Sequence, residues 1–396
     1  MKKYAMLTSE TATEGHPDKL CDQICDAIVD RFLQQDRYAR IRCECAVSNA
    51  IVFIAARFSC CEAADLAQIA RDVIGEVGYN EPDFNAKNCS ILTIPQELPC
   101  EDDSRFDEQA LTEKEADRIA VKNQVTVFGC ACDHTPALMP LPIWLCNRIA
   151  RQLDMVRKEG RLSYLRPDGK VHVGIDFFQN NATRVHSISL MASQSNLKKP
   201  GRQTVYDDIR ETVIDPVFAS EDIKIDNSTR IFINPDGPYL GGPSEHPGLT
   251  GRKNAADTYG EYCRRSGSAL SGKDPLRIDR VGVYMARYAA KNIVAAGLAC
   301  CCEVACSYSI GMAEPVSLQV ETFGTGVVPD EELVEQIKRH FDFRVATILK
   351  VFHLRDLPRT HPDGFYRKLA TYGHLGRTDL DLPWEKTDQS DLLRRG

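Results

Sequence analysis

The chain has 396 residues, of which 43% are hydrophobic and 27% charged, enough to bury a large core in two or three domains. A net charge of −7 argues against general binding to nucleic acid or to a membrane surface. No apolar run approaches the length of a transmembrane helix, and the N-terminus, MKKYAMLTSE, is too short and too polar for a signal peptide.

The first predicted helix covers residues 17–34. Apolar side chains recur there at three- and four-residue intervals, namely Leu20, Ile24, Ala27, Ile28 and Phe32. Pro17 suits the first helical position, where a missing N–H group costs nothing. The stretch TEGHPDK therefore predicts a helix start that carries a histidine, His16, and a carboxylate, Asp18.

Local sequence leaves two interpretations of His16 and Asp18 open. In the first, Asp18 only stabilises the helix dipole and His16 is an ordinary capping neighbour. In the second, the free N–H groups at the helix start bind a phosphate, and Asp18 holds the metal ion that accompanies it.

A helix, two strands and a second helix follow one another three times. The first set is a helix at 17–34, strands within 43–58, a helix near 62–76 and a further strand at 88–94. The second is a helix at 142–160, strands at 171–178 and 185–193, a helix near 205–214 and a strand at 230–234. The third is a helix at 279–297, strands at 302–310 and 316–324, and a helix near 331–341. The order predicts three related α+β domains, each an antiparallel or mixed sheet backed by helices.

The acidic segment 97–118 separates the first set from the second. Its sequence, ELPCEDDSRFDEQALTEKEADR, is rich in charge and poor in apolar residues. We therefore predict an exposed loop or a mobile flap there.

The 16 cysteines do not form the pattern of a disulfide framework. Cys300, Cys301 and Cys302 are consecutive, and no C-x-x-C pair suggests a zinc site. Most cysteines sit among apolar residues, where a free thiol behaves as a small hydrophobic group. The sequence predicts reduced thiols in a cytoplasmic protein.

Two later stretches combine glycine with basic residues. PGLTGRKN carries Arg252 and Lys253, and GSALSGKDPLRIDR carries Lys273, Arg277 and Asp279. Glycine lets the backbone approach an anion and the cations neutralise it, although each stretch alone is also compatible with a solvated turn. The second stretch matches G-x-x-x-x-G-K but continues with aspartate in place of Ser or Thr, and no buried strand precedes it, so a P-loop is not predicted.

Taken together, these motifs resemble the S-adenosylmethionine synthetase family. The resemblance rests on EGHPDK, FINPDGPYLGGP, GLTGRK, DTYG, SGKDP, IDR, ARYAAKNIVAAGLA, YSIG, VETFGT and YGHLGR…PWEKTD, in this order along nearly the whole chain. It implies three pseudo-symmetric α+β domains and a homodimer or dimer of dimers with active sites between subunits. It also implies that a methionine sulfur attacks C5′ of ATP, and that the expelled triphosphate is cleaved to pyrophosphate and phosphate.

The resemblance assigns roles to individual residues. It places His16 beside the breaking C5′–O bond, Asp18 and Asp279 on two Mg²⁺ ions, and Glu44 near a K⁺ ion. The phosphate-facing cations are Lys170, Arg252, Lys253, Lys273 and Arg277, the last of which stands where the family usually has lysine. Of these, Lys170, Arg252 and Lys273 join His16 as predicted catalytic residues. Lys253, Arg277, Asn123 and Ile310 are predicted to bind the nucleotide.

The departures from the family gather at its amino-acid and nucleoside end. Arg57 stands in place of a glutamate, and Asn123 and His246 in place of aspartates, while QSPDI is missing before the acidic segment. Three explanations are open: drift with compensation, loss of catalysis, or a changed sulfur acceptor. An arginine about 4 Å from the methionine ammonium would repel it by roughly 4 kcal/mol, or about a thousandfold in affinity. Arg57 and His246 therefore favour an acceptor that is uncharged there or anionic.

From the sequence we predict an ATP-dependent adenosyltransferase that acts on methionine or an analogue. The alternatives are a transferase specific for another thioether and a regulatory homologue that binds ATP without turnover. The predicted domains are 3–100, 120–238 and 240–390, with the reservation that structural domains may interleave in sequence.

Overall fold

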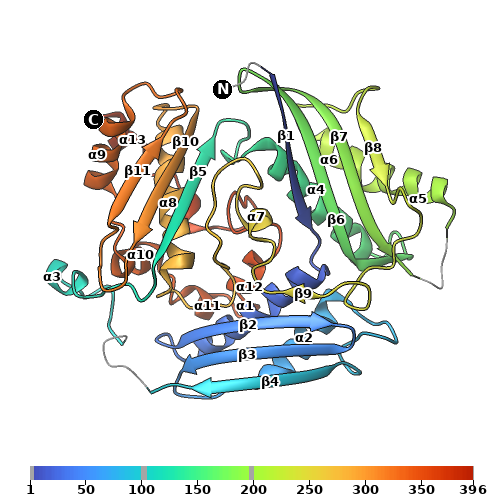
Figure 1. Ribbon diagram of the computed structural model, residues 1–396, viewed down its shortest axis with the longest axis horizontal. Coiled ribbons are helices and arrows are strands. Elements are labelled where there is room, and N and C mark those ends of the chain that lie inside the picture. The colour runs from blue at the N-terminus through green and yellow to red at the C-terminus, as the bar shows by residue number, and fades with distance from the viewer. Residues whose placement is uncertain (1–3, 100–104, 196–199, 396) are drawn as a thin grey trace.

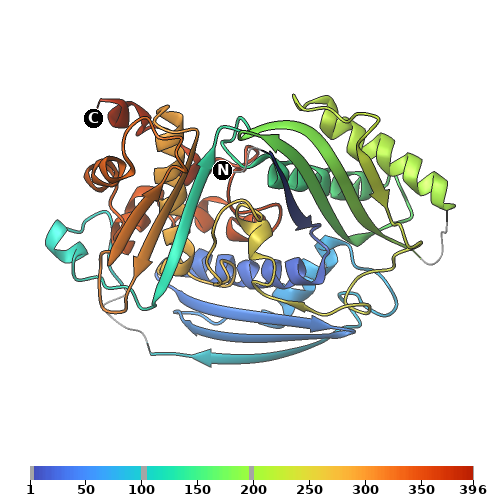
Figure 2. The ribbon, with the colours of Figure 1, turned by 45° about the horizontal axis from the view of Figure 1, so that its top comes forward.

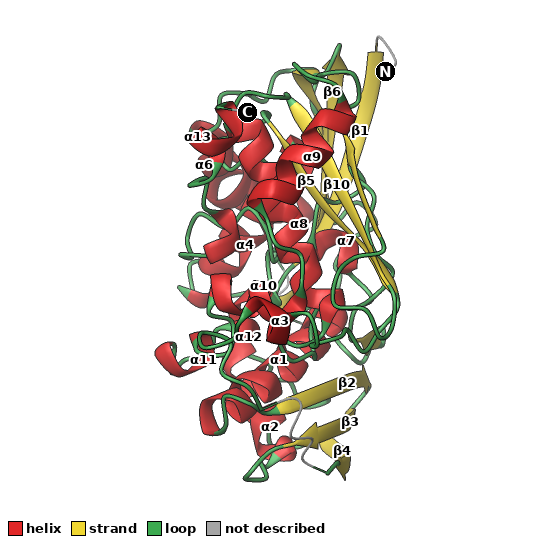
Figure 3. Ribbon diagram, turned by 90° about the vertical axis from the view of Figure 1, so that its left-hand side faces the viewer, coloured by secondary structure: helices red, strands yellow, loops and turns green. Residues whose placement is uncertain are grey.

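The computed structural model describes residues 4–99, 105–195 and 200–395 and folds them into three sheets with helices packed behind them (Figure 1). Figure 3 shows most of the helices on one side of the molecule and the strands on the other. This arrangement confirms the predicted α+β class. No helix in the described residues is long and apolar enough to cross a membrane.

The first sheet has the strand order β4-β3-β2-β9. Its strands are β2 (Arg40–Ser48), β3 (Ile51–Ser59), β4 (Ser90–Glu97) and the two-residue β9 (Gly248–Leu249). β2 pairs antiparallel with β3 and β9, and β4 joins β3 in parallel. Helices α1 (Pro17–Gln35) and α2 (Leu66–Val77) lie behind this sheet (Figure 2). The residues that face away from the helices stay exposed.

The second sheet repeats this plan with the order β1-β6-β7-β8. It contains β1 (Tyr4–Ala12), β6 (Leu165–Phe178), β7 (Asn181–Gln194) and β8 (Arg230–Ile233). The β6–β7 hairpin takes β1 antiparallel on one edge and β8 parallel on the other. Behind it lie α4 (Leu141–Lys158), α5 (Arg202–Ile209) and α6 (Asp215–Ala219), the last two joined by a π-helical turn at Arg210–Ile214.

The third sheet has three antiparallel strands in the order β11-β10-β5. These are β5 (Val125–Cys132), β10 (Cys301–Tyr308) and β11 (Ser317–Glu321), backed by α8 (Ile278–Ala295) and α9 (Asp330–His340). The C-terminal segment adds α10 (Val345–Phe352), α11 (Leu357–Thr360), α12 (Tyr366–Leu369), a 3₁₀ turn (Pro383–Glu385) and α13 (Ser390–Arg394). Two short helices, α3 (Glu113–Ala116) and α7 (Asn254–Asp257), lie in connecting loops.

Each predicted set of helices and strands is present, but each sheet also takes one strand from elsewhere in the chain. β9 joins the first sheet, β1 the second and β5 the third, each antiparallel to the first strand of the local hairpin. None of these three added strands was predicted. The sheets therefore interleave in sequence, and the ranges 3–100, 120–238 and 240–390 stay a prediction.

The structure differs from the expectation that all cysteines are reduced. Cys130 and Cys263 lie with Cα atoms 6.5 Å apart and form a disulfide, so the expectation of wholly reduced thiols is wrong for this pair. The two residues are 133 positions apart in the chain, and only the fold brings them together.

In the acidic segment 97–118, residues 100–104 lie outside the described residues, while Glu108 is buried in ion pairs with Arg37 and Arg355.

Candidate active site

One face of α1 carries four aspartates at intervals of four residues, and together they accept backbone N–H groups from three distant segments. Asp18 accepts from Leu249 (3.0 Å), Asp22 from Gly251 (2.7 Å), Asp26 from Gly272 (2.9 Å) and Asp30 from Tyr366 (2.9 Å). Positions i and i+4 share a helix face, so the row aligns both glycine-rich stretches along α1. Asp22 and Asp26, which the sequence reasoning missed, therefore hold the phosphate motifs in place.

The glycines of these stretches allow this close approach. A Cβ atom on Gly248 would lie 2.2 Å from the carbonyl carbon of Pro17 at the start of α1. Gly272 has a φ of 77°, and its Cβ would lie 2.1 Å from the carbonyl oxygen of Cys43. Only glycine fits either position without displacing backbone.

His16 is the N-cap residue of α1, as the sequence predicted for the helix start. Its Nδ1 accepts the backbone N–H of Asp18 at 3.2 Å. Burial lowers the pKa of His16 to about 4, although the Asp168 and Asp18 carboxylates oppose the shift. The ring is therefore neutral near pH 7. Because Nδ1 accepts, the proton lies on Nε2, which is a hydrogen-bond donor.

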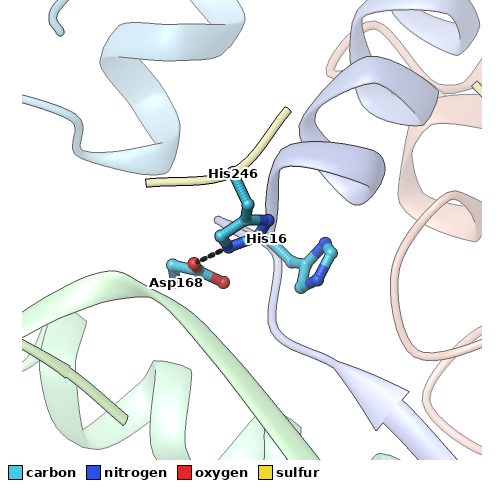
Figure 4. Close-up of side chains that lie close together, drawn as sticks. All are labelled: His16, Asp168 and His246. Atoms are coloured by element: carbon cyan, nitrogen blue, oxygen red, sulfur yellow. Dashed lines mark hydrogen bonds and ion pairs between the residues drawn. The ribbon is translucent and has the colours of Figure 1, made fainter. Parts of the chain in front are cut away.

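His246 and Asp168 form an ion pair beside this ring (Figure 4). Oδ2 of Asp168 accepts from His246 Nε2, the Tyr239 hydroxyl and the Gly242 N–H, each at 2.8 Å. Burial opposes ionisation of Asp168, but the hydrogen bond from His246 and the nearby ring charges outweigh it, so its pKa is lowered. The same hydrogen bond raises the pKa of His246. Asp168 and Tyr239 were not among the predicted site residues, although Asp168 lies two residues before Lys170 and Tyr239 lies within the motif FINPDGPYLGGP.

The three side chains in Figure 4 also have the composition of a metal site. His16, Asp168 and His246 each offer a donor atom within 4.8 Å of the others. However, Nδ1 of His16 accepts the backbone N–H of Asp18, so the ring proton lies on Nε2. A metal ion on Nε2 would require that proton to move to Nδ1, which would break the hydrogen bond from Asp18. We therefore interpret this group as an ion pair next to a neutral donor.

Three predicted cations surround the same end of α1. Lys170 pairs with Glu10 at 2.7 Å, and Lys253 lies 3.5 Å from Glu10 and 3.9 Å from Asp18. Arg252 lies 3.8 Å from Asp18. Together with His16 these residues make a half-site with donors and cations at a helix N-terminus, an arrangement suited to a polyphosphate.

A second half-site lies at the N-terminus of α8. Asp279 is 3.3 Å from Lys273 and accepts from the Asn123 amide at 2.7 Å. Burial lowers the pKa of Lys273, while Lys273 and the Asn123 amide hold the pKa of Asp279 below its usual value despite burial. Arg277, the N-cap residue of α8, points a guanidinium toward Asp274 at 3.8 Å.

The two half-sites are separate within one chain. Asp18 contacts the segment at Leu249, whereas Asp26, eight residues further along α1, contacts Gly272 next to Lys273. Eight residues of helix span about 12 Å. The two predicted Mg²⁺ carboxylates, Asp18 and Asp279, therefore belong to half-sites whose contacts with α1 are about 12 Å apart in one chain.

Arg57 lies with the second half-site and His246 with the first, so the three substituted positions are not one cluster in a single chain. Arg57 is exposed on β3 and lies opposite Arg42 on β2. On the other side of β2, the backbone of Arg42 forms an isolated β-bridge with Lys273. Within the described residues the side chain of Arg57 has no ion-pair or hydrogen-bond partner. Ile310, after β10, is 64% exposed.

Comparison with known proteins covers the whole chain. Models of the S-adenosylmethionine synthetase N-terminal, central and C-terminal domains match residues 4–98, 118–239 and 240–386. The S-adenosylmethionine synthase of Synechococcus sp. (strain JA-3-3Ab) is 45% identical over 406 residues, covering 98% of this chain and 97% of that protein. Those of Gloeothece citriformis (43%) and Trichormus variabilis (44%) each cover 100% of this chain, and the match spans 97% of each of those proteins.

Proposed function

The chain belongs to the S-adenosylmethionine synthetase family, and we propose that it joins a thioether sulfur to C5′ of ATP and then cleaves the expelled triphosphate. The observation that carries this proposal is the half-site at α1, where neutral His16 lies among Lys170, Arg252 and Lys253. Attack by the sulfur lone pair breaks the C5′–O bond, and the negative charge that develops on the leaving oxygen needs donors already in place.

His16 supplies such a donor. Its Nε2–H stays protonated as part of a neutral ring down to about pH 4, so the hydrogen bond to the leaving oxygen does not depend on taking up a further proton. The N-cap hydrogen bond to Asp18 fixes the orientation of the ring. We assign Lys170, Arg252, Lys253, Lys273 and Arg277 to the phosphates, and Asn123 and Ile310 to the nucleoside.

Asp18 and Asp279 are the carboxylates that we propose for two Mg²⁺ ions. Both are the second residue of a helix, at a place where phosphate oxygens would meet free N–H groups. Oδ2 of Asp18 lies 3.7 Å from His16 and 3.9 Å from Lys253, beyond hydrogen-bond distance, so this oxygen has room for a hard cation. When bound, the ions spread the charge on the phosphate oxygens.

We propose that the active enzyme is a homodimer or a dimer of dimers. The uncovered face of the first sheet presents Ile51, Phe53, Leu92, Ile94 and Leu249, which are between 38% and 57% exposed. A twofold axis across this face would cover the apolar side chains and set the α1 half-site of one protomer opposite the α8 half-site of its partner. Each complete site would then use both protomers.

The family uses ATP and methionine, and this chain departs from the family at the positions expected to bind the amino acid and the nucleoside, Arg57, Asn123 and His246. In the structure the substituted side chains are donors: Asn123 donates to Asp279, His246 donates to Asp168, and Arg57 is an exposed cation. None of them is a carboxylate that could form an ion pair with an ammonium group. We propose that Arg57 and His246 shift preference from methionine toward a thioether without the ammonium or with an added acidic group.

The test is an assay of the purified protein with Mg²⁺, ATP and a panel of thioethers that includes methionine, together with added triphosphate. We expect a sulfonium product and phosphate, and cleavage of triphosphate supplied alone. ATP binding without either product would leave the regulatory homologue as the better account. A cytoplasmic location, predicted from the cysteine pattern, is tested separately by fractionation of cells that express the chain.

A further inference from the structure

Glu44, the carboxylate that the resemblance places near K⁺, already has a cation beside it. Nη2 of Arg42 lies 2.9 Å from Oε1 of Glu44, and the two residues project from the same face of β2 because they are two positions apart. This ion pair was not predicted, since Arg42 does not belong to any of the quoted motifs.

The neighbours of this pair are also basic. In the antiparallel register Arg57 of β3 lies opposite Arg42. On the other side of β2, the backbone of Lys273 pairs with that of Arg42 in an isolated β-bridge. Arg57, Arg42 and Lys273 therefore lie in a row across β3, β2 and the loop segment that pairs with β2 at Arg42. The residue opposite Glu44 is Ala55, which offers no oxygen from its side chain.

These residues do not fit a K⁺ ion. An ion on Glu44 would share its carboxylate with the guanidinium and lie about 4 Å from that charge. Because both side chains are more than half exposed, the repulsion weakens binding by between about fivefold, at the dielectric of water, and about a thousandfold, at an effective dielectric near 20. Arg57, whose side chain has no ionic partner among the described residues, adds to the repulsion, whereas Lys273 is paired with Asp279. We propose that the guanidinium of Arg42 takes the place of the monovalent cation, and that this chain works without K⁺.

An arginine suits this role physically. It carries the same unit charge, is always protonated, and holds a carboxylate through directed hydrogen bonds, whereas K⁺ requires several oxygen ligands. Being attached to β2, the charge is present at any salt composition. The inference depends on the proposed function only for its activity readout, because cation binding is measured separately.

The experiment compares the unmutated protein with Arg42→Gln in K⁺ and in tetramethylammonium buffers, following phosphate release and sulfonium formation. Binding of Tl⁺, a K⁺ substitute, is measured on the same proteins by ²⁰⁵Tl NMR. Arg184→Gln is the matched control, because Arg184 also forms an ion pair on a sheet, with Asp176, away from both half-sites.

We expect the unmutated protein and Arg184→Gln to have equal rates in both buffers and to bind no Tl⁺. Arg42→Gln should be at least tenfold faster in K⁺ than in tetramethylammonium, and should bind Tl⁺. Activation of the unmutated protein by K⁺ would overturn the proposal, and so would an Arg42→Gln protein that neither responds to K⁺ nor binds Tl⁺. If no protein turns over, the proposed function fails while the Tl⁺ measurement still decides this inference.

Discussion

Two histidines lie side by side at the start of α1, and their surroundings give them opposite charge states. The ring centroids of His16 and His246 are 5.0 Å apart. His16 is buried and engaged by a backbone N–H, which keeps it neutral, whereas the hydrogen bond to Asp168 favours the charged form of His246. The nearby His246 charge further disfavours protonation of His16. One ring can therefore donate to a leaving oxygen while the other neutralises a buried carboxylate.

Replacing His16 tests its role as a donor. We expect His16→Asn to slow sulfonium formation by about 10²–10³-fold, the usual cost of removing one preorganised donor, with a smaller effect on cleavage of added triphosphate. Asparagine is an effective N-cap residue, so this variant keeps α1 capped where alanine would not. Rates of both reactions on one preparation are the measurement. Equal slowing of both reactions would contradict a role at the C5′–O bond.

The His246–Asp168 pair makes stability depend on pH. The folded state raises the pKa of His246 above the usual 6.5, so the pair stabilises fully below pH 6.5 and loses its effect as pH rises through the folded-state pKa. Thermal unfolding of the unmutated protein and His246→Gln should therefore differ more at pH 6 than at pH 9. A gap that widens toward pH 9 would show that the pair is not charged as described.

The acceptor preference is tested by restoring the carboxylates of the family. We expect the unmutated protein to use methionine less well than its deaminated analogue, measured as kcat/KM. Arg57→Glu combined with His246→Asp should move the ratio toward methionine, because each change replaces a donor by an acceptor for the ammonium group. If the unmutated protein already prefers methionine as strongly as ordinary members of the family, the substitutions are better explained by sequence drift with compensation than by a changed sulfur acceptor.

At the scale of elements, helix α1 organises the site, and its apolar face was readable from the sequence. The spacing of Leu20, Ile24 and Phe32 predicted a helix at 17–34, close to the observed Pro17–Gln35. On its opposite face only Asp18 was interpreted, because the further aspartates Asp22, Asp26 and Asp30 at four-residue spacing look like a solvated surface. They are buried, since the loops at Gly251 and Gly272 return to α1 from more than 200 residues away.

The strands that the sequence reasoning missed have a similar cause. β9 has two residues and no pattern of its own, while β1 and β5 are positioned by antiparallel pairing with β6 and β10. Local periodicity identifies hairpins and amphipathic helices but not which distant segment completes a sheet. For the same reason Asp168 and Tyr239, which are joined to each other across 71 residues of chain, were not found, whereas Arg42 was missed because it lies outside the recognised motifs.

The row of aspartates predicts a stability effect. Asp26 forms a fully buried ion pair with Arg280 and also accepts the Gly272 N–H. Asp26→Ala should lower the free energy of unfolding by about 3–5 kcal/mol, because it leaves a buried guanidinium unpaired. Asp72→Ala on the exposed face of α2 is the control and should change it by less than about 0.5 kcal/mol. Denaturant unfolding of both proteins checks the difference, and equal stability would mean that the pair does not hold the loop.

At the scale of the whole molecule, three repeats of one plan generate two similar helix N-termini that carry an aspartate. Asp18 on α1 and Asp279 on α8 occupy the same second helical position in their repeats, and the contacts of their half-sites lie eight residues apart along α1. In the proposed dimer a second copy covers the exposed apolar face of the first sheet and joins the two half-sites. The proposed function therefore requires an assembly in which each site takes one half from each protomer.

Complementation between two inactive variants tests this claim most directly. Asp18→Asn and Asp279→Asn each damage a different half-site, so both homodimers should lose adenosyl transfer. If each site uses both protomers, a mixed dimer contains one site with both defects and one intact site. Unfolding and refolding the two variants together should then restore about a quarter of the unmutated rate of sulfonium formation from ATP, because half of the dimers are mixed. A mixture that contains mixed dimers but forms no more sulfonium than either variant alone would contradict the account.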